Sequence, residues 1–268
     1  MPEPLYRLEH VTVRFGTQDV LRDITLTIEP GQTIAIIGES GCGKTTLIKL
    51  LVGLQSPTRG EIRFGHQSVP AMTEKDLTTL RRRVGFLFQS AALFDSLNVF
   101  DNIAFGLRAH NVLPESDLAK RVCERLADVG LTDATATKMP AELSGGMRKR
   151  VGLARSLALD PDVMLYDEPT TGLDPVMSEV INDLIIQTRS KRPITSVMVT
   201  HEMRTVRKVA DRVVMLEPLG RLALDEPQVI FDGPTADLET SRDPRVRKFI
   251  GLPPITITAL VKTSGVTS

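Results

Sequence analysis

The 268-residue sequence predicts an α/β protein with a parallel sheet between helices, an antiparallel β part and a helical insert. Three short runs, 34–38, 163–168 and 196–201, are apolar throughout, as expected for strands that helices cover on both faces. Residues 5–28 instead alternate between apolar and polar side chains, which indicates antiparallel strands with one wet face. From residue 95 to 159 we find helical patterns and no buried strand, so this stretch is predicted to be the insert.

Helices are predicted between and after these strands, where apolar residues recur at three- and four-residue intervals. In one of them an apolar stripe runs from Met147 to Ala158 at positions i, i+4, i+7 and i+11, and Asp160-Pro161 follows its end. The predicted helices are 45–52, 116–129, 147–159, 175–189 and 203–210.

Composition excludes several classes of protein. The 33 basic and 33 acidic residues cancel, so no net field attracts nucleic acid, and none is expected as a partner. Two cysteines are too few for a disulfide framework and lack metal-ligand spacing, which favours a reducing cytoplasm. The N-terminus has no signal-peptide pattern, and no apolar run reaches about 18 residues. A membrane role would therefore depend on a partner.

A phosphate-binding loop is the most specific motif. The segment GESGCGKTT matches G-x-x-x-x-G-K-[ST] between an apolar strand and a helix. Its glycines let the backbone curl and expose N–H groups to phosphate oxygens, while Lys44 reaches the β- and γ-phosphates and Thr45 offers its hydroxyl to Mg²⁺. Cys42 occupies a variable position of the motif. A redox-sensitive thiol is one interpretation, but a small residue that only fills the position is favoured. The predicted phosphate-binding residues are Gly38, Glu39, Ser40, Gly41, Cys42, Gly43, Lys44, Thr45 and Thr46.

Two carboxylates and a histidine follow apolar strands. Asp167 and Glu168 are neighbours, and they would repel each other unless a cation is present. Asp167 is expected to hold Mg²⁺ through its water shell, and Glu168, pointing the other way along the pleat, to polarise the attacking water. His201 also follows an apolar strand, at the edge where α/β sheets bind ligands. An isolated acidic pair or a lone histidine is more often structural, but the shared sheet edge favours a functional site.

The motifs together resemble the ATP-binding subunit of an ABC transporter over nearly all of residues 5–250. Beside the Walker A loop and the Walker B strand stand FQSAALF with Gln89, LSGGM at 143–147, TGLD with Asp174 and VTHE with His201. The resemblance implies a P-loop NTPase with a RecA-like parallel core, an antiparallel β subdomain and an inserted α-helical subdomain. The implied regions are 1–94 with antiparallel β and the first part of the core, 95–157 as the helical subdomain, 158–250 as the rest of the core, and 251–268 as a tail.

The resemblance also implies roles for single residues. Phe15 would stack on adenine, with Tyr6 as the fallback, and stacking explains weak base selectivity because any purine offers a π-face. Gln89 would contact Mg²⁺ and the attacking water while sensing the membrane partner, and His201 would contact the γ-phosphate. The implied catalytic residues are Glu168, His201, Gln89 and Lys44; the metal ligands are Thr45, Gln89 and Asp167; ATP and Mg²⁺ are the cofactors.

The LSGGM turn would act on a second copy of the chain. In this family it closes on the nucleotide of an antiparallel subunit, so two copies of one chain make two complete sites. Ser144, Gly145 and Gly146 would cap the γ-phosphate of the partner's nucleotide at a helix start, with Asp174 at the same interface.

Residues 88–108 and 243–251, and Met147 in LSGGM, resemble more narrowly the ATPase of the Mla/MCE-type phospholipid transporters of bacterial envelopes. Residues 90–108 would then receive a coupling helix of integral membrane permease subunits. An MCE-type lipid-binding protein is expected in the complex. The chain itself is expected to be peripheral, on the cytoplasmic face of the inner membrane. Residues 217–233 look longer than the usual hairpin and have no assigned role; the tail after Gly251 does not match the Mla extension.

Other readings stay open or are disfavoured. An ATPase of an amino-acid or other small-solute importer would share every catalytic motif. An ABC protein of DNA repair would carry a long coiled coil between the Walker motifs, and a translation factor would carry two cassettes; this sequence has neither. A P-loop kinase would not need LSGGM. The transporter class is therefore favoured.

Overall fold

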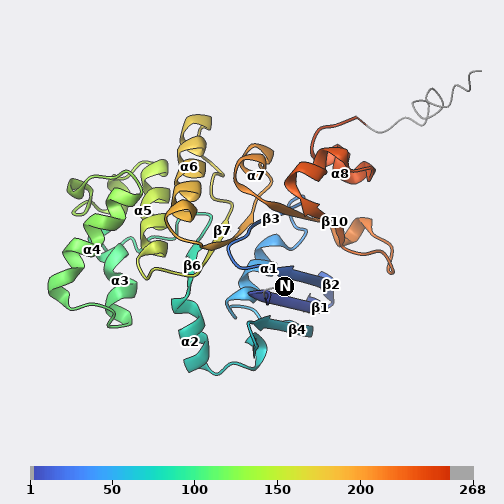
Figure 1. The fold of residues 1–268 in the computed structure, drawn as a ribbon, viewed down its shortest axis with the longest axis horizontal. Coiled ribbons are helices and arrows are strands. Elements are labelled where there is room, and N and C mark those ends of the chain that lie inside the picture. Colours follow the sequence, from blue (N-terminus) through green and yellow to red (C-terminus); the bar gives the residue numbers. More distant parts are fainter. Residues whose placement is uncertain (1–2, 254–268) are drawn as a thin grey trace, which may run out of the picture.

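Two sheets organise the protein in a computed structural model that describes residues 3–253 (Figure 1). The larger has the strand order β10-β9-β3-β8-β7-β6, and the smaller the order β2-β1-β4-β5. Of the tail predicted at 251–268, residues 254–268 lie outside the described part. The structure thus confirms the predicted combination of a mainly parallel sheet, an antiparallel sheet and helices.

The larger sheet is parallel except for its edge strand β10, which runs antiparallel to β9. Every residue of β3, β7 and β8 is buried, because helices and the smaller sheet cover one face and helices cover the other. These are the three strands predicted from apolar runs. The sheet comprises β3 (Thr33–Ile37), β6 (Val84–Leu87), β7 (Val163–Asp167), β8 (Thr195–Val199), β9 (Arg212–Leu216) and β10 (Val229–Pro234).

The smaller sheet carries the predicted alternation. In β1, Tyr6, Leu8, Val11 and Val13 are buried while the residues between them face outwards or lie half-buried. Their buried side chains pack on the phosphate-loop helix α1 and the near face of the larger sheet in one apolar core. The strands are β1 (Tyr6–Phe15), β2 (Gln18–Ile28), β4 (Arg59–Phe64) and β5 (Gln67–Ser68).

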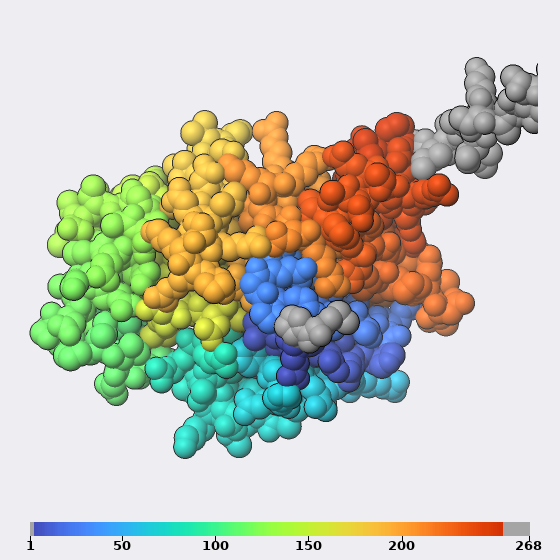
Figure 2. Space-filling view, in the orientation of Figure 1, coloured from blue at the N-terminus to red at the C-terminus, as the bar shows by residue number. Residues whose placement is uncertain are grey.

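The helical insert forms one end of the molecule, and β10 with α8 the other (Figures 1 and 2). Helices α3, α4 and α5 pack together around a second apolar core that also contacts the far face of the larger sheet. In the predicted stripe of α5, Val151, Ala154 and Ala158 are buried, and Met147 is partly buried. The helices are α1 (Lys44–Leu51), α2 (Glu74–Arg82), α3 (Val99–Ala109), α4 (Glu115–Asp128), α5 (Gly145–Leu157), α6 (Pro175–Lys191), α7 (Met203–Val209) and α8 (Pro244–Phe249).

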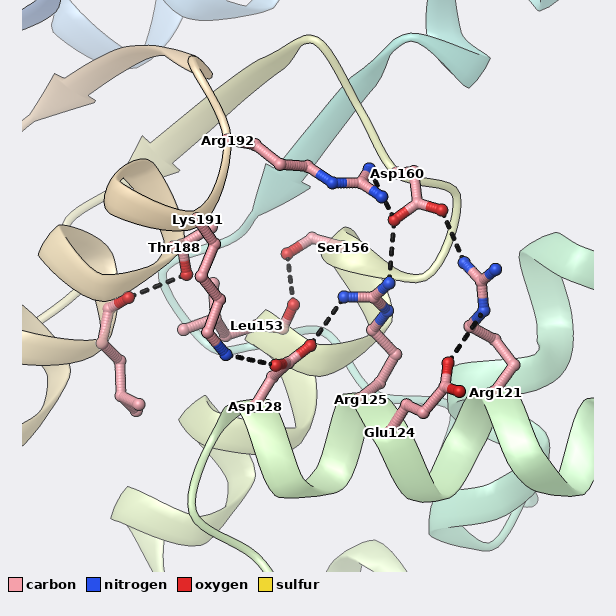
Figure 3. A network of polar contacts seen from close by, with 11 residues as sticks. Arg121, Glu124, Arg125, Asp128, Leu153, Ser156, Asp160, Thr188, Lys191 and Arg192 are labelled. Atoms are coloured by element: carbon pink, nitrogen blue, oxygen red, sulfur yellow. Dashed lines mark hydrogen bonds and ion pairs between the residues drawn. The ribbon is translucent and has the colours of Figure 1, made fainter.

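An ion-pair network joins the helical insert to the larger sheet (Figure 3). Its centre is Asp160, between α5 and β7, whose left-handed backbone (φ 54°) is tolerated by Asp and Asn better than by most residues. Its carboxylate accepts bonds from Arg121 at 2.6 Å and from Arg125 at 2.8 Å, both on α4, and lies 2.8 Å from Arg192, just after α6. One carboxylate therefore holds three segments that are distant in sequence.

Replacing Asp160 by Asn should lower the free energy of unfolding by about 1–2 kcal/mol, because the partly buried guanidinium groups of Arg121 and Arg125, and the exposed one of Arg192, lose their shared anion while the backbone conformation is kept. Urea unfolding of the purified chain measures this. Asp162→Asn is the matched control, since that side chain is 55% exposed and pairs with Arg83 alone. Equal losses in the two variants would show that the network adds nothing beyond a surface ion pair.

Candidate functional site

The phosphate loop needs its glycines for space as well as for conformation. Gly38 has φ 146°, and a Cβ there would lie 2.4 Å from the carbonyl oxygen of Leu216. Gly43 has φ 97°, and a Cβ there would lie 2.6 Å from Leu21. Any larger residue at either position would push the loop away from β9 or β2. The loop is therefore fixed against both sheets.

Lys44 and Thr45 begin helix α1 directly after this loop. The ammonium group of Lys44 donates to the carbonyl oxygens of Gly38 at 2.8 Å and Glu39 at 3.0 Å, so it lies folded across the loop. The hydroxyl of Thr45 donates to Oδ1 of Asp167 at 3.0 Å. The loop and the end of β7 thus meet, as the sequence predicts for a shared sheet edge.

Asp167 and Glu168 point to different partners. Burial, followed by the neighbouring Glu168 charge, raises the pKa of Asp167, and the bond from Thr45 opposes this shift. The sequence predicted that the pleat of β7 would orient Glu168. Instead, Glu168 lies beyond the end of β7 and has φ 48°, so a left-handed backbone sets its orientation. Its backbone N–H donates to the Val199 carbonyl at 2.9 Å, which ties this turn to β8.

The carboxylate of Glu168 contacts His201. Nδ1 of His201 lies 2.9 Å and 3.1 Å from the two carboxylate oxygens, and the Thr171 hydroxyl donates to the same group at 2.9 Å. The Glu168 side chain is 12% exposed and that of His201 is 55% exposed. Lys149 on α5 donates to the Glu168 carbonyl at 3.0 Å, and burial lowers the pKa of this lysine. The sequence had not indicated a role for Lys149.

Gln89 projects from a strained loop after β6. Ala91 and Ala92 have φ 64° and 46°, a left-handed conformation that costs energy for residues other than glycine. Arg155 on α5 offsets this cost, because its guanidinium donates to both of their carbonyls at 2.8 Å. Arg155 is thus a structural support for the Gln89 loop that sequence patterns do not reveal.

One cavity of about 700 Å³ brings most of these groups together. The phosphate loop, Gln89, Glu168 and His201 line it as predicted, and Val20 and Phe249 line it without having been predicted. Three predicted residues lie behind the lining instead: Gly38, Cys42 and Asp167 are buried and contribute no surface to the cavity. The lining residues are Val20, Glu39, Ser40, Gly41, Gly43, Lys44, Thr45, Thr46, Gln89, Glu168, His201 and Phe249.

The two aromatic candidates for adenine stacking differ sharply. Phe15, at the end of β1, is 49% exposed and stays available, although it is not part of the cavity lining. Tyr6 is fully buried and packs against Phe64 with their ring centroids 4.9 Å apart. The fallback role of Tyr6 was therefore wrong, because its ring belongs to the core.

The LSGGM turn lies outside this cavity. Ser144 is the N-cap of α5 and accepts a bond from the Met147 N–H at 3.2 Å. Gly146 is buried against Met177 on α6, and a Cβ at this position would lie only 2.6 Å from that side chain. Asp174 is the N-cap of α6 and accepts from the Met177 N–H at 2.9 Å. Ser144, Gly145 and Asp174 are exposed, so the two helix starts form a polar surface of their own.

A family model described as ABC transporter matches residues 21–171. The chain belongs to the ABC transporter family. It is 40% identical over 246 residues to the intermembrane phospholipid transport system ATP-binding protein MlaF of Escherichia coli K12, covering 92% of this chain and 88% of that one. MlaF of Haemophilus influenzae is 39% identical over 250 residues, with 93% and 91% covered. The probable ribonucleotide transport ATP-binding protein mkl of Mycobacterium tuberculosis H37Rv is 40% identical over 240 residues, which cover 90% of this chain and 64% of the length of mkl.

Solved ABC cassettes share the fold. A dimeric structure of the bacterial ABC transporter cassette MJ0796 is 29% identical with a TM-score of 0.77, covering 86% of this chain and 98% of that one. Its post-hydrolysis dimer, bound to ADP and Pi, has a TM-score of 0.75 at 28% identity and the same coverage. The family and these neighbours confirm the P-loop NTPase fold. This ABC chain binds and hydrolyses ATP to energise transport. Within residues 3–253, no helix is both long and apolar enough to cross a bilayer.

Proposed function

We propose that the chain is the ATPase subunit of a bacterial phospholipid transporter. The observation that carries this proposal is the similarity to MlaF along 92% of the chain, at 40% identity. The stretches 88–108 and 243–251, which resemble this branch of the family, fall in the Gln89 loop with α3 and in α8. The division of the chain at residues 94, 157 and 250 stays a prediction.

The cavity supports an assignment of roles for ATP. The loop N–H groups, Lys44 and the start of α1 would hold the phosphates, and Phe15 would stack on the base from the end of β1. Glu168 would accept a proton from water as that water attacks the γ-phosphorus and the bond to the β-phosphate oxygen breaks. His201 contacts Glu168 and would contact the γ-phosphate, so it would hold the carboxylate in place during the reaction.

The residues beside the phosphate loop fit Mg²⁺. Thr45 and Asp167 offer oxygen atoms 3.0 Å apart, and Gln89 lines the same cavity, which suits a hard cation that also binds substrate phosphates. Burial raises the pKa of Asp167 and so disfavours its ionised form. A cation bound beside this carboxyl group would counter that effect and favour the ionised form. When bound, Mg²⁺ would neutralise charge on the phosphates.

The exposed LSGGM turn supports a homodimer. Ser144 and Gly145 sit at a helix start away from the cavity of their own chain, and a helix start binds anions. MJ0796, a cassette of the same fold, is dimeric. In this chain, Ser144, Gly145, Gly146 and Asp174 would complete the nucleotide site of a second copy.

An apolar surface near Gln89 supports docking of a membrane permease. Phe94 and Phe105 are 42% and 48% exposed, with their ring centroids 4.6 Å apart. Aromatic side chains left in water beside a polar loop mark a protein contact surface. The chain would thus lie on the cytoplasmic face of the inner membrane, with permease subunits and an MCE-type lipid-binding protein as partners.

Co-purification tests the substrate class. The chain, expressed together with its membrane permease partners, should carry phospholipid into the purified complex, detected by mass spectrometry of a lipid extract. A complex with Phe94→Ser in the chain is the control, because it should lose the permease and with it the lipid. A lipid-free complex whose ATPase is stimulated by an amino acid or a ribonucleotide with its binding protein would favour a small-solute importer.

A further inference from the structure

The segment from 217 to 228, between β9 and β10, lies against β2 and the phosphate loop. It begins after β9, forms a short 3₁₀ turn at Leu219–Arg221, and returns to β10 at the end of the sheet opposite the helical insert (Figure 1). It belongs to the stretch 217–233, which looks longer than the usual hairpin in the sequence and has no role assigned there. Its polar side chains contact β2 and the phosphate loop, which are nearly 200 positions away in sequence.

Gln228 makes the central contact and is 2% exposed. Its Oε1 accepts a bond from the Arg22 N–H at 2.9 Å. Its Nε2 donates to the Cys42 carbonyl at 3.0 Å and to the Val20 carbonyl at 3.3 Å. A single carboxamide therefore joins β2 to the phosphate loop.

These contacts suit a carboxamide and few other groups. A glutamine side chain offers two N–H donors and one acceptor, and both kinds are used here. A buried backbone N–H or carbonyl without a partner costs free energy comparable to a lost hydrogen bond. An apolar side chain at this position would leave groups of Arg22 and Cys42 without these bonds.

Outer contacts hold the segment in place. Arg221 donates to both carboxylate oxygens of Glu39 at 2.7 Å, which lowers the pKa of that carboxyl group, and Arg245 on α8 donates to Glu226 at 2.8 Å. The guanidinium of Arg22 donates to the carbonyls of Ala223 and Glu226. Arg221 and Glu39 are about half exposed, so this pair contributes less than the buried carboxamide.

We propose that Gln228 is a positioning residue of the nucleotide site, which holds the phosphate loop at a fixed distance from β2 and thereby sets the affinity for ATP. Val20 lines the cavity beside the loop, so a shift between β2 and Cys42 changes the shape of the site before ATP enters. Gln228 touches neither the cavity nor the reacting groups. A residue that positions the loop without touching the reacting groups should affect the binding of substrate and transition state alike, which predicts a change in KM without a matching change in kcat. The proposal rests on ATP binding at this phosphate loop.

Replacing Gln228 by Met keeps the length of the side chain and removes the three hydrogen bonds. In the full-length chain we expect KM for ATP to rise about five- to thirty-fold, with kcat within about two-fold of the original. Gln228→Asn keeps the carboxamide but shortens its reach, so it should raise KM by a smaller factor. Leu224→Ser is the matched control in the same segment, because Leu224 is 93% exposed, and it should change neither constant.

Steady-state hydrolysis and titration with a fluorescent ATP analogue supply the constants, and circular dichroism verifies folding. If Gln228→Met does not fold, the KM of Gln228→Asn decides. A KM equal to that of Leu224→Ser, or a loss confined to kcat, would overturn the positioning role. Lys44→Ala separates this outcome from failure of the proposed function: it abolishes ATP binding if the phosphate loop is the site, whatever Gln228 does.

Discussion

Glu168→Gln should leave ATP binding intact and lower the rate of hydrolysis by roughly 10²–10⁴-fold. The substitution keeps the size of the side chain and its place between Thr171 and His201, but it removes the oxygen that can take a proton from water. The Glu168 side chain is 12% exposed, so bulk water has limited access to the site and cannot easily accept the proton in place of the carboxylate. Phosphate release under single-turnover conditions measures the loss, and ATP should then accumulate in a closed dimer detected by size-exclusion chromatography.

Glu202→Gln provides the control for this experiment. Glu202 follows the same strand β8 but does not line the cavity, so its loss should change the rate of hydrolysis little. If Glu168→Gln and Glu202→Gln hydrolysed ATP equally well, Glu168 would not be the base. Another group would then have to receive the proton.

Residues of the site were predictable from sequence where one local motif fixes them. The phosphate loop needs its glycines within nine residues. Asp167 ends β7, Glu168 follows it and His201 follows β8, and all five residues of each strand are buried. A continuous apolar run is visible in the sequence, and the parallel sheet brings the ends of such strands to one edge. Strand β9 has the same kind of apolar run, buried from Val213 to Leu216, so its sequence also carries the signal of a buried strand.

The supporting residues were not predictable, because their contacts join distant parts of the chain. Arg155 reaches the carbonyls of the Gln89 loop from 64 positions away, and Gln228 reaches Cys42 from 186 positions away. Nothing in the composition around a glutamine or an arginine indicates which carbonyl it will meet. Strand β10 was missed for another reason: it contains Gly233 and Pro234 and lies at a sheet edge, so its burial pattern is irregular.

The orientation of Glu168 shows a limit of periodicity as a guide. An alternating pleat predicts that neighbours in a strand face opposite sides, and the two carboxylates do have different partners. The cause is different, since β7 ends at Asp167 and Glu168 adopts a left-handed backbone held by the bond to Val199. Such strain is common at functional sites, where surrounding contacts fix it.

Ser144→Arg should abolish hydrolysis while each copy still binds ATP. Ser144 is exposed at the start of α5, so an arginine fits in the monomer and costs only the cap of about 1 kcal/mol. In a dimer, the long side chain would occupy the space where the partner's γ-phosphate must approach the helix start. Phosphate release and equilibrium binding of an ATP analogue measure the two effects.

Mixing two inactive variants tests whether the site is shared between copies. Lys44→Ala disables the phosphate loop, and Ser144→Arg disables the signature turn. If each site takes its loop from one copy and its turn from the other, a mixed dimer contains one site with both defects and one site with neither. The mixture should therefore regain part of the hydrolysis that each variant lacks alone. A site built within one chain would regain nothing, because every copy would keep its own defect.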